Sequence, residues 1–224
     1  SIYFENISKG IKEALNLVNV KIAGGDLTSY DGPLIASVTA VGKNSNYKNL
    51  LRRRGGKVND LLAVTGNIGE SFIGLNCIEK KIKIDNKIQK KKAIDSFLYP
   101  PRLYNFAYAL TKYAKSCIDL SDGLIEDAGK LGIISNCGVS LFRNSIPLSN
   151  LGKLLTKKKI FTLSDLLLAG DDYQLAFSFD KKYFKKILNM EKKFKIKISI
   201  IGKIIKEKGV YLDGKKVSGG FSHF

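Results

Sequence analysis

Short apolar runs bounded by glycine, aspartate or polar residues recur through most of the chain, and they constrain the fold more than any other feature of the sequence. Runs of this kind predict β-strands, and the stretches between them carry apolar residues at helical spacing. The expected strands cover residues 20–23, 34–41, 61–65, 117–120, 138–142, 174–179, 197–201 and 209–212. Strands and helices do not follow a strict β-α-β order, so the pattern predicts an α+β fold in which helices pack on a sheet.

The first helix is expected over residues 2–18, where apolar side chains recur every three or four positions. Ser121 predicts the N-cap of another helix, and the lysine-rich stretch from Lys80 to Lys92 predicts an exposed loop. Glycines directly after Arg54 predict a domain boundary there.

Composition excludes several classes of protein. The 224 residues, 44% of them hydrophobic, can bury a core without a disulfide or metal staple. No apolar stretch approaches the roughly 18 residues of a membrane span, and the first residues do not have the pattern of a signal peptide. Cys77, Cys117 and Cys137 lack metal-site spacing and His223 is the single histidine, which argues against zinc and favours a reducing, cytoplasmic compartment.

The formal net charge of +18 raises the possibility of a nucleic-acid partner. Lysine greatly outnumbers arginine, however, and arginine is the residue preferred for bidentate contacts to phosphates and bases. The lysines are also scattered along the chain, so the pattern favours a solvated surface over nucleic-acid binding.

Two sequence segments combine the end of an expected strand with glycine and carboxylate. In Ala23-Gly24-Gly25-Asp26, the glycines would let a phosphate approach bare backbone amides, although a plain turn explains the same spacing. In the segment 118–124, Asp119 ends a strand and Ser121 and Asp122 begin a helix, where anions and hard cations can bind. Helix capping accounts for Ser121 and Asp122 but leaves the polar strand end at Asp119 unexplained.

A third acidic segment, Gly170-Asp171-Asp172-Tyr173, places two carboxylates side by side before a strand. Adjacent like charges are unfavourable unless water, a cation or a ligand offsets them. A solvated loop and a functional site explain this segment equally well.

The three segments, followed by the closing Gly220-Phe221-Ser222-His223-Phe224, form an ordered pattern along the chain. This pattern resembles that of the thiamine-monophosphate kinase family, which belongs to the aminoimidazole-ribonucleotide-synthetase-like superfamily. The string Asp119-Leu120-Ser121-Asp122-Gly123-Leu124 is the most specific mark of the resemblance, which spans nearly the whole chain.

The resemblance implies ATP-dependent phosphorylation of thiamine monophosphate to thiamine diphosphate with Mg²⁺, in a homodimer. It implies no catalytic side chain that forms a covalent intermediate. It assigns ATP contacts to Gly25, Asp26, Arg53 and Ser121, magnesium contacts to Asp26, Asp119 and Asp122, and substrate contacts to Asp171 and Phe221. Carboxylates that hold Mg²⁺ between two phosphate-bearing substrates would supply the positioning and charge neutralisation that phosphoryl transfer needs.

The chain departs from the family pattern at several points. Asp171 stands where the family usually has Glu, and Ser218 stands where it usually has an aromatic residue. The first part of the family's N-terminal domain has no counterpart, so residues 1–52 are expected to be the remaining half of an ATP-binding α/β domain and residues 53–224 a complete C-terminal α/β sandwich domain. In the family this missing part carries further metal-binding aspartates, so a chain without it is expected to show little kinase activity by itself.

Two alternatives remain open from the sequence. One is another ATP-dependent enzyme of the superfamily, such as a purine-biosynthesis synthetase, which the string from Asp119 to Leu124 argues against. The other is a non-catalytic basic module that binds nucleic acid.

Overall fold

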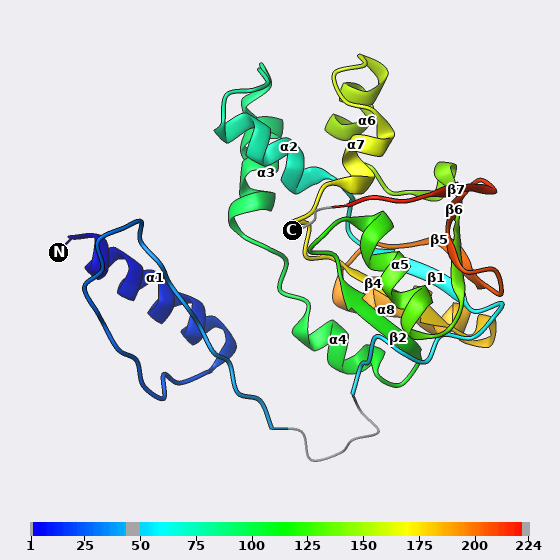
Figure 1. The fold of residues 1–224 in the computed structure, drawn as a ribbon, viewed down its shortest axis with the longest axis horizontal. Helices are drawn as coiled ribbons and strands as arrows, with labels where there is room; N and C mark the ends of the chain where they lie inside the picture. Colours follow the sequence, from blue (N-terminus) through cyan, green and yellow to red (C-terminus); the bar gives the residue numbers. More distant parts are fainter. Residues whose placement is uncertain (1, 44–49, 221–224) are drawn as a thin grey trace. The chain divides into compact units, whose positions relative to one another are not determined.

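The computed structural model describes residues 2–43 and 50–220, and the chain divides into two compact units, Ser1–Lys43 and Asn44–Phe224 (Figure 1). The first unit holds α1 (Ile2–Val18), and the second holds every strand of the described residues. The division into a half-domain over residues 1–52 and a complete domain over residues 53–224 stays a prediction.

Helix α1 confirms the helix predicted over residues 2–18. It ends where Asn19 takes a left-handed conformation and the backbone N–H of Val20 donates to the carbonyl oxygen of Leu15 over 3.1 Å. No described residue of the first unit is buried, and apolar side chains such as Tyr3 and Leu34 are more than three-quarters exposed, at 77% and 78%.

The strands predicted over residues 20–23 and 34–41 are wrong, because both stretches lack regular secondary structure. An isolated extended segment has no partner for its backbone N–H and C=O groups. Within residues 2–43 of the described chain no neighbouring strand supplies one.

The second unit is built on one mixed sheet of seven strands in the order β2-β4-β1-β5-β3-β6-β7. Its strands are β1 (Leu61–Thr65), β2 (Ala114–Asp119), β3 (Gly138–Leu141), β4 (Leu175–Phe179), β5 (Ile198–Ile205), β6 (Gly209–Leu212) and β7 (Lys215–Val217). All neighbouring strands are antiparallel except β3 and β6, which are parallel. The predicted strands from residue 61 onward are confirmed in position.

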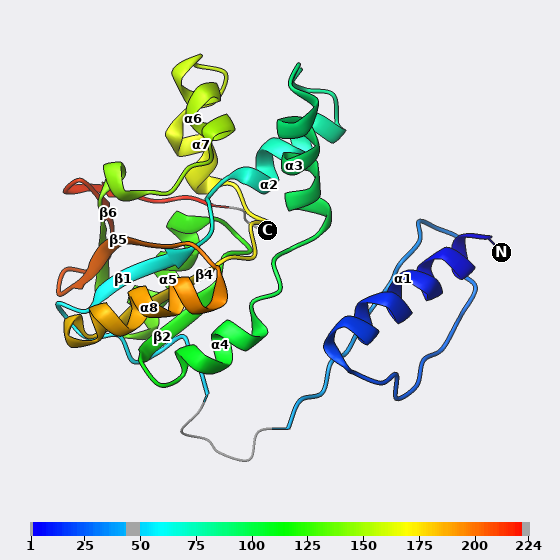
Figure 2. The ribbon, with the colours of Figure 1, turned by 180° about the vertical axis from the view of Figure 1, so that it is seen from behind.

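Helices cover both faces of this sheet, as the two opposite views show (Figures 1 and 2). α5 (Leu124–Ile134) packs on one face, where Leu62 and Val64 of β1 join its buried side chains. α4 (Tyr104–Leu110) and α8 (Phe184–Phe194) pack on the other, where Ala63 belongs to the opposite core. This division follows from the alternation of side chains along a strand.

Four further helices form a separate apolar cluster: α2 (Glu70–Ile78), α3 (Lys87–Leu98), α6 (Asn150–Lys157) and α7 (Leu163–Leu168). Short 3₁₀ turns, η2 (Arg143–Ser145) and η3 (Lys181–Tyr183), precede α6 and α8. The exposed loop predicted from Lys80 to Lys92 is wrong beyond Asn86, whose side chain accepts the backbone N–H of Gln89 and begins α3.

The predicted α+β class is confirmed, with one sheet between helical layers. None of the helices in the described parts of the chain combines the length and apolar character needed to cross a bilayer.

Candidate functional site

The turn between β2 and α5 carries three of the predicted site residues. Buried Cys117 and Ile118 anchor the last part of β2, and Asp119 follows at its end with a side chain that is 47% exposed. A guanidinium nitrogen of Arg53 lies 4.0 Å from a carboxylate oxygen of Asp119. The end of β2 therefore presents an acidic and a basic group together at the surface of the second unit.

The segment from Gly170 to Gln174 runs beside this turn and is held to it by backbone hydrogen bonds. The N–H of Asp171 donates to the carbonyl oxygen of Ser121 over 3.0 Å, and the N–H of Tyr173 donates to that of Leu120 over 2.8 Å. Asp171 and Tyr173 both have left-handed backbones, with φ of 65° and 47°. Such conformations are uncommon for residues other than glycine and persist where the surroundings impose them.

Two glycines permit this close approach of backbones. A Cβ on Gly170 would overlap the carbonyl oxygen of Ser121, and one on Gly123 would lie 2.6 Å from the carbonyl oxygen of Leu168. Gly123, with φ of 105°, is also the N-cap residue that directly precedes α5. The prediction that Ser121 caps this helix is wrong, because the N-cap position falls on Gly123, two residues later, and no side chain caps the helix there.

The negative charges of the three predicted carboxylates all act on Tyr173. Burial raises the pKa of its phenol, and the negative charges of Asp171, Asp119 and Asp122 raise it further. We call Asp119, Asp122, Asp171 and Tyr173 the acidic cluster. Sequence reasoning assigned roles to the three carboxylates, and it gave none to Tyr173.

One end of the acidic cluster is neutralised by a lysine that sequence reasoning missed. Lys130 of α5 forms ion pairs with Asp122 and with Asp127, the latter at 3.0 Å, and Asp127 also accepts the backbone N–H of Asp122 over 2.9 Å. Asp127 is buried, and desolvation raises the pKa of its carboxyl against these hydrogen bonds. The three-residue spacing of Asp127 and Lys130 on a helix was the available signal for this pair.

Asp172, next to Asp171, points away from solvent and has a different role. It is 5% exposed and accepts the backbone N–H of Gly69 over 2.6 Å and that of Ser71 over 3.2 Å. Burial raises the pKa of Asp172 to about 7, against the two backbone hydrogen bonds, which lower it. Asp172 therefore joins the acidic segment to the start of α2.

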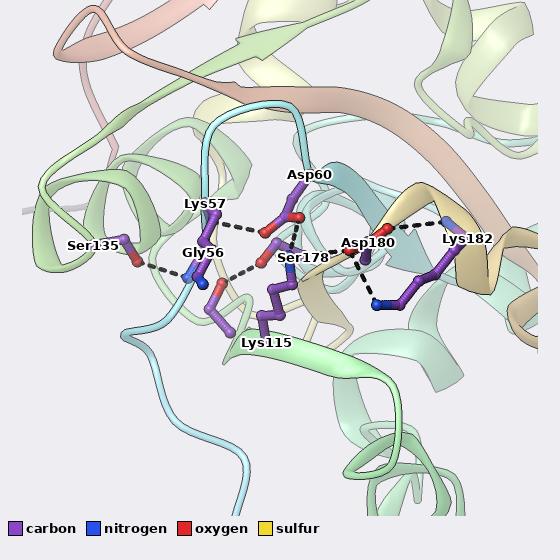
Figure 3. A network of polar contacts seen from close by, with 9 residues as sticks. Gly56, Lys57, Asp60, Lys115, Ser135, Ser178, Asp180 and Lys182 are labelled. Atoms are coloured by element: carbon purple, nitrogen blue, oxygen red, sulfur yellow. Dashed lines mark hydrogen bonds and ion pairs between the residues drawn. The ribbon is translucent and has the colours of Figure 1, made fainter.

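The arm that carries Arg53 is held by hydrogen bonds on both sides of that residue, and Figure 3 shows the part from Gly56 onward. The carbonyl oxygen of Arg52 accepts the backbone N–H of Cys117 over 2.8 Å, and the hydroxyl of Ser135 accepts the N–H groups of Gly55 and Gly56. Beyond them, buried Asp60 accepts the N–H of Lys57 and pairs with Lys115 at 2.5 Å, and Lys115 reaches Asp180 at 3.7 Å. Figure 3 shows this network joining the backbone of Gly56 and Lys57 to Ser135 and to Lys115 near the start of β2.

The remaining predicted residues lie elsewhere. Gly25 and Asp26 belong to the first unit, where both are exposed and a carboxylate oxygen of Asp26 accepts the N–H of Leu27 over 2.8 Å. A Cβ on Gly25 would have open space around it. Phe221 and His223 lie outside the described residues.

The carboxylates of the acidic cluster suit a magnesium ion that arrives with phosphate groups. Among the described residues, no three His, Cys, Asp or Glu side chains lie close enough to hold a metal ion by themselves. Mg²⁺ in proteins commonly takes one or two carboxylates and completes its octahedron with water and substrate phosphates. Asp119 and Asp122 are the candidate carboxylates here, and Asp122 is paired with Lys130.

The cysteines are not candidate nucleophiles. All three are buried and free, and burial raises the pKa of the Cys117 thiol to about 12. Because the thiolate is the reactive form, a thiol held neutral in this way does not attack a substrate.

Gly170 offers a direct test of this geometry. Gly170→Ala is expected to lower the free energy of unfolding by about 1–3 kcal/mol, because the new methyl group forces the acidic segment away from Ser121. Thermal unfolding followed by circular dichroism measures the change. Gly152→Ala in α6 is the matched control, since the nearest atoms to its Cβ lie at 3.5 Å or beyond and leave room for a methyl group. An equally stable Gly170→Ala protein would contradict the close packing of the two segments.

Comparison with known proteins finds curated relatives that match the whole chain. No protein-family model matches it. The thiamine-monophosphate kinase of Buchnera aphidicola subsp. Schizaphis graminum (strain Sg) is 37% identical over 232 residues, which cover 100% of this chain and 70% of that protein. The enzyme of the same name from Buchnera aphidicola subsp. Acyrthosiphon pisum (strain APS) is 34% identical, with the same coverage of both chains.

Solved structures of similar fold agree with these relatives. AaThiL complexed with AMPPCP and TMP has a TM-score of 0.67 and 28% identity, over 78% of this chain and 54% of that chain. Escherichia coli HypE, a hydrogenase maturation protein, has a TM-score of 0.63 at 14% identity, which shows a shared fold alone. The present chain spans about half the length of the chains in these solved structures. With 37% identity over its whole length to a curated relative, the chain belongs to the thiamine-monophosphate kinase family.

Proposed function

We propose that the chain forms the part of a thiamine-monophosphate kinase that holds the phosphate groups of ATP and of thiamine monophosphate during transfer. The family is one of phosphotransferases, and its member AaThiL binds AMPPCP and TMP. The acidic cluster carries the proposal, since the charges of its three carboxylates all act on Tyr173 and Arg53 lies 4.0 Å from Asp119 at the end of β2.

Each predicted site residue has a proposed role in binding ATP, Mg²⁺ or thiamine monophosphate. Arg53 contacts the nucleotide, Ser121 contacts ATP, and Asp171 faces the substrate. Gly25 and Asp26 of the first unit contact ATP, and Phe221 packs against the substrate. Asp119 and Asp122 hold Mg²⁺, a role that the family pattern also gives to Asp26. Mg²⁺ held by these carboxylates would supply positive charge against the phosphate oxygens.

The reaction needs no covalent intermediate on the protein. A phosphate oxygen of thiamine monophosphate forms a bond to the γ-phosphorus of ATP, the bond from that phosphorus to the bridging oxygen breaks, and ADP leaves. Such a transfer depends on alignment and on stabilisation of charge. The fixed arm before Gly55 and the close-packed segment after Gly170 supply rigid supports for Arg53 and Asp171.

Two further features of the assembly belong to the proposal. The first unit exposes many apolar side chains, including Leu34 and Val38, and we propose that they pack in a homodimer or against other parts of the protein. Sedimentation equilibrium that reported only monomers would contradict the dimer.

The buried free thiols agree with a reducing compartment, and we place the enzyme in the cytoplasm.

The binding test uses a nucleotide that cannot transfer its phosphoryl group. AMPPCP with Mg²⁺ is expected to raise the midpoint of thermal unfolding, because a ligand at a hundred times its Kd stabilises the folded state by about 2.7 kcal/mol. Neither AMPPCP with EDTA nor Mg²⁺ alone should have this effect, since the carboxylates need the metal to accept the phosphates. Stabilisation by a DNA duplex with a steep salt dependence, and none by Mg²⁺-AMPPCP, would contradict the proposal and support a nucleic-acid-binding module.

A further inference from the structure

A cavity of about 340 Å³ lies between the helical cluster and the start of β5, and it shares no residue with the acidic cluster. Its polar lining comprises Asn67, Glu70, Gln89, Lys92, Lys153 and Lys197, together with the first residues around α6. We call it the lysine pocket. Its volume falls within the range of small-molecule sites.

Three lysines from three different elements converge on the lysine pocket. Lys92 lies on α3, Lys153 on α6, and Lys197 directly before β5. Lys197 donates to the side-chain oxygen of Asn67 over 2.9 Å, and Lys92 and Lys153 form no ion pair with any residue in the described parts of the chain. Burial and the charges of Lys153 and Lys92 lower the pKa of Lys197 against the nearby carboxylate of Glu191. The lysines therefore form a positive region that an anion would stabilise.

Glu70 adds a second requirement. It is the first residue of α2, it is 6% exposed, and its Oε2 atom has no hydrogen-bond partner among the described residues. A buried oxygen without a partner is unfavourable by roughly 1–3 kcal/mol. A ligand that offers a hydrogen-bond donor removes this deficit. A hydroxyl group fits better than an ammonium group, because the three lysines repel a further cation.

We infer that the lysine pocket binds a small phosphate ester that carries at least one hydroxyl group. The three ammonium groups bind the phosphate oxygens, and the carboxylate of Glu70 accepts the hydroxyl. A phosphate monoester carries about 1.5 to 2 negative charges at pH 7 and three terminal oxygens, which matches three lysines better than a carboxylate does.

The test uses the full chain, without Mg²⁺, titrated calorimetrically at constant ionic strength. Glycerol 3-phosphate is the ester probe, and inorganic phosphate and glycerol present its two halves separately. We expect glycerol 3-phosphate to bind more tightly than inorganic phosphate, and glycerol alone to give no signal. Equal affinities for inorganic phosphate and glycerol 3-phosphate would overturn the requirement for a hydroxyl-bearing ligand.

Three variants locate the binding. Lys153→Gln is expected to lower the affinity for glycerol 3-phosphate about tenfold, because one charge-assisted contact is lost. Lys206→Gln, an equally exposed lysine after β5, should leave the affinity unchanged. Glu70→Gln should reduce the difference in affinity between glycerol 3-phosphate and inorganic phosphate.

Asp119→Asn separates this site from the acidic cluster, because it should not alter the affinity for glycerol 3-phosphate. A folded chain that fails to bind the ester, or equal losses in Lys153→Gln and Lys206→Gln, would overturn the inference. Neither result would bear on binding of Mg²⁺-AMPPCP at the acidic cluster.

Discussion

Asp119→Asn is expected to reduce phosphoryl transfer from ATP to thiamine monophosphate at least about a hundredfold, the range seen when one preorganised electrostatic contact to a reacting group is removed. The substitution keeps the size of the side chain and removes the charge that binds Mg²⁺. Turnover is measured on the gene product that contains this chain, and Mg²⁺-dependent binding of AMPPCP is measured on the chain itself. Both should fall together.

The same substitution should leave the fold nearly unchanged. The side chain of Asp119 is 47% exposed, and its ion pair with the 56% exposed Arg53 spans 4.0 Å. Exposed pairs of this kind contribute about 0–1 kcal/mol. Asp213→Asn is the matched control, because Asp213 is 50% exposed and also pairs with an arginine, Arg143, at 3.2 Å. If Asp119→Asn and Asp213→Asn retained equal turnover and equal nucleotide binding, Asp119 would have no role in holding the metal.

Asp172→Asn, in contrast to Asp119→Asn, is expected to lower the stability of the fold substantially. The amide has one oxygen in place of two, so one of the buried N–H groups of Gly69 and Ser71 loses its acceptor. An unsatisfied buried group lowers the free energy of unfolding by about 1–3 kcal/mol. In a chain of this size, a loss of about 2 kcal/mol lowers the unfolding midpoint by roughly 4–8 °C. Differential scanning calorimetry measures the shift.

Asp171→Asn is the control for this prediction, because asparagine tolerates the left-handed backbone of Asp171 and that side chain is not buried. It should leave the midpoint within about 2 °C, less than a 1 kcal/mol effect, while binding of thiamine monophosphate weakens. Equal losses of stability in the two variants would show that Asp172 does not cap α2 as the structure indicates.

The pH dependence of stability gives a second measurement of Asp172. Its pKa is about 7 in the folded chain, raised from the usual 3.8. The folded state therefore retains a proton that the unfolded state releases between pH 4 and 7, and this contribution to stability is lost as the pH rises through that window. Asp172→Asn should lack this slope, so the difference in stability between the two proteins should shrink from pH 5 to pH 8. A difference that stays constant over this range would mean that Asp172 is ionised throughout.

Much of the second unit could be predicted from local sequence. Leu61–Thr65 and Leu175–Phe179 are apolar runs with polar or acidic residues at their ends, and they form neighbouring strands β1 and β4. The spacing of Leu124, Ala128 and Leu131 gave α5 its buried face. These elements are predictable because burial of one side of a strand or helix fixes the period of its apolar residues.

The same local pattern failed in the first unit. Residues 20–23 and 34–41 have the composition of strands and are not strands, since a strand also needs a pairing partner. Ser121 has the composition of an N-cap and is not one, because α5 begins only after Gly123, whose backbone packs closely against Leu168. In both cases the deciding contact comes from outside the local segment.

The sequence by itself determined the α+β class, most strands and helices of the second unit, and the residues whose order matches the kinase family. Only the tertiary structure decided that the charges of Asp119, Asp122 and Asp171 act on Tyr173. It also decided that Asp172 caps α2, and that Lys92, Lys153 and Lys197 share a cavity with Glu70. Periodicity is set by burial along one element and can be read residue by residue. Clusters of charge join residues far apart in the chain, and their pairing depends on close approaches such as that of Gly170 to Ser121, which no local pattern encodes.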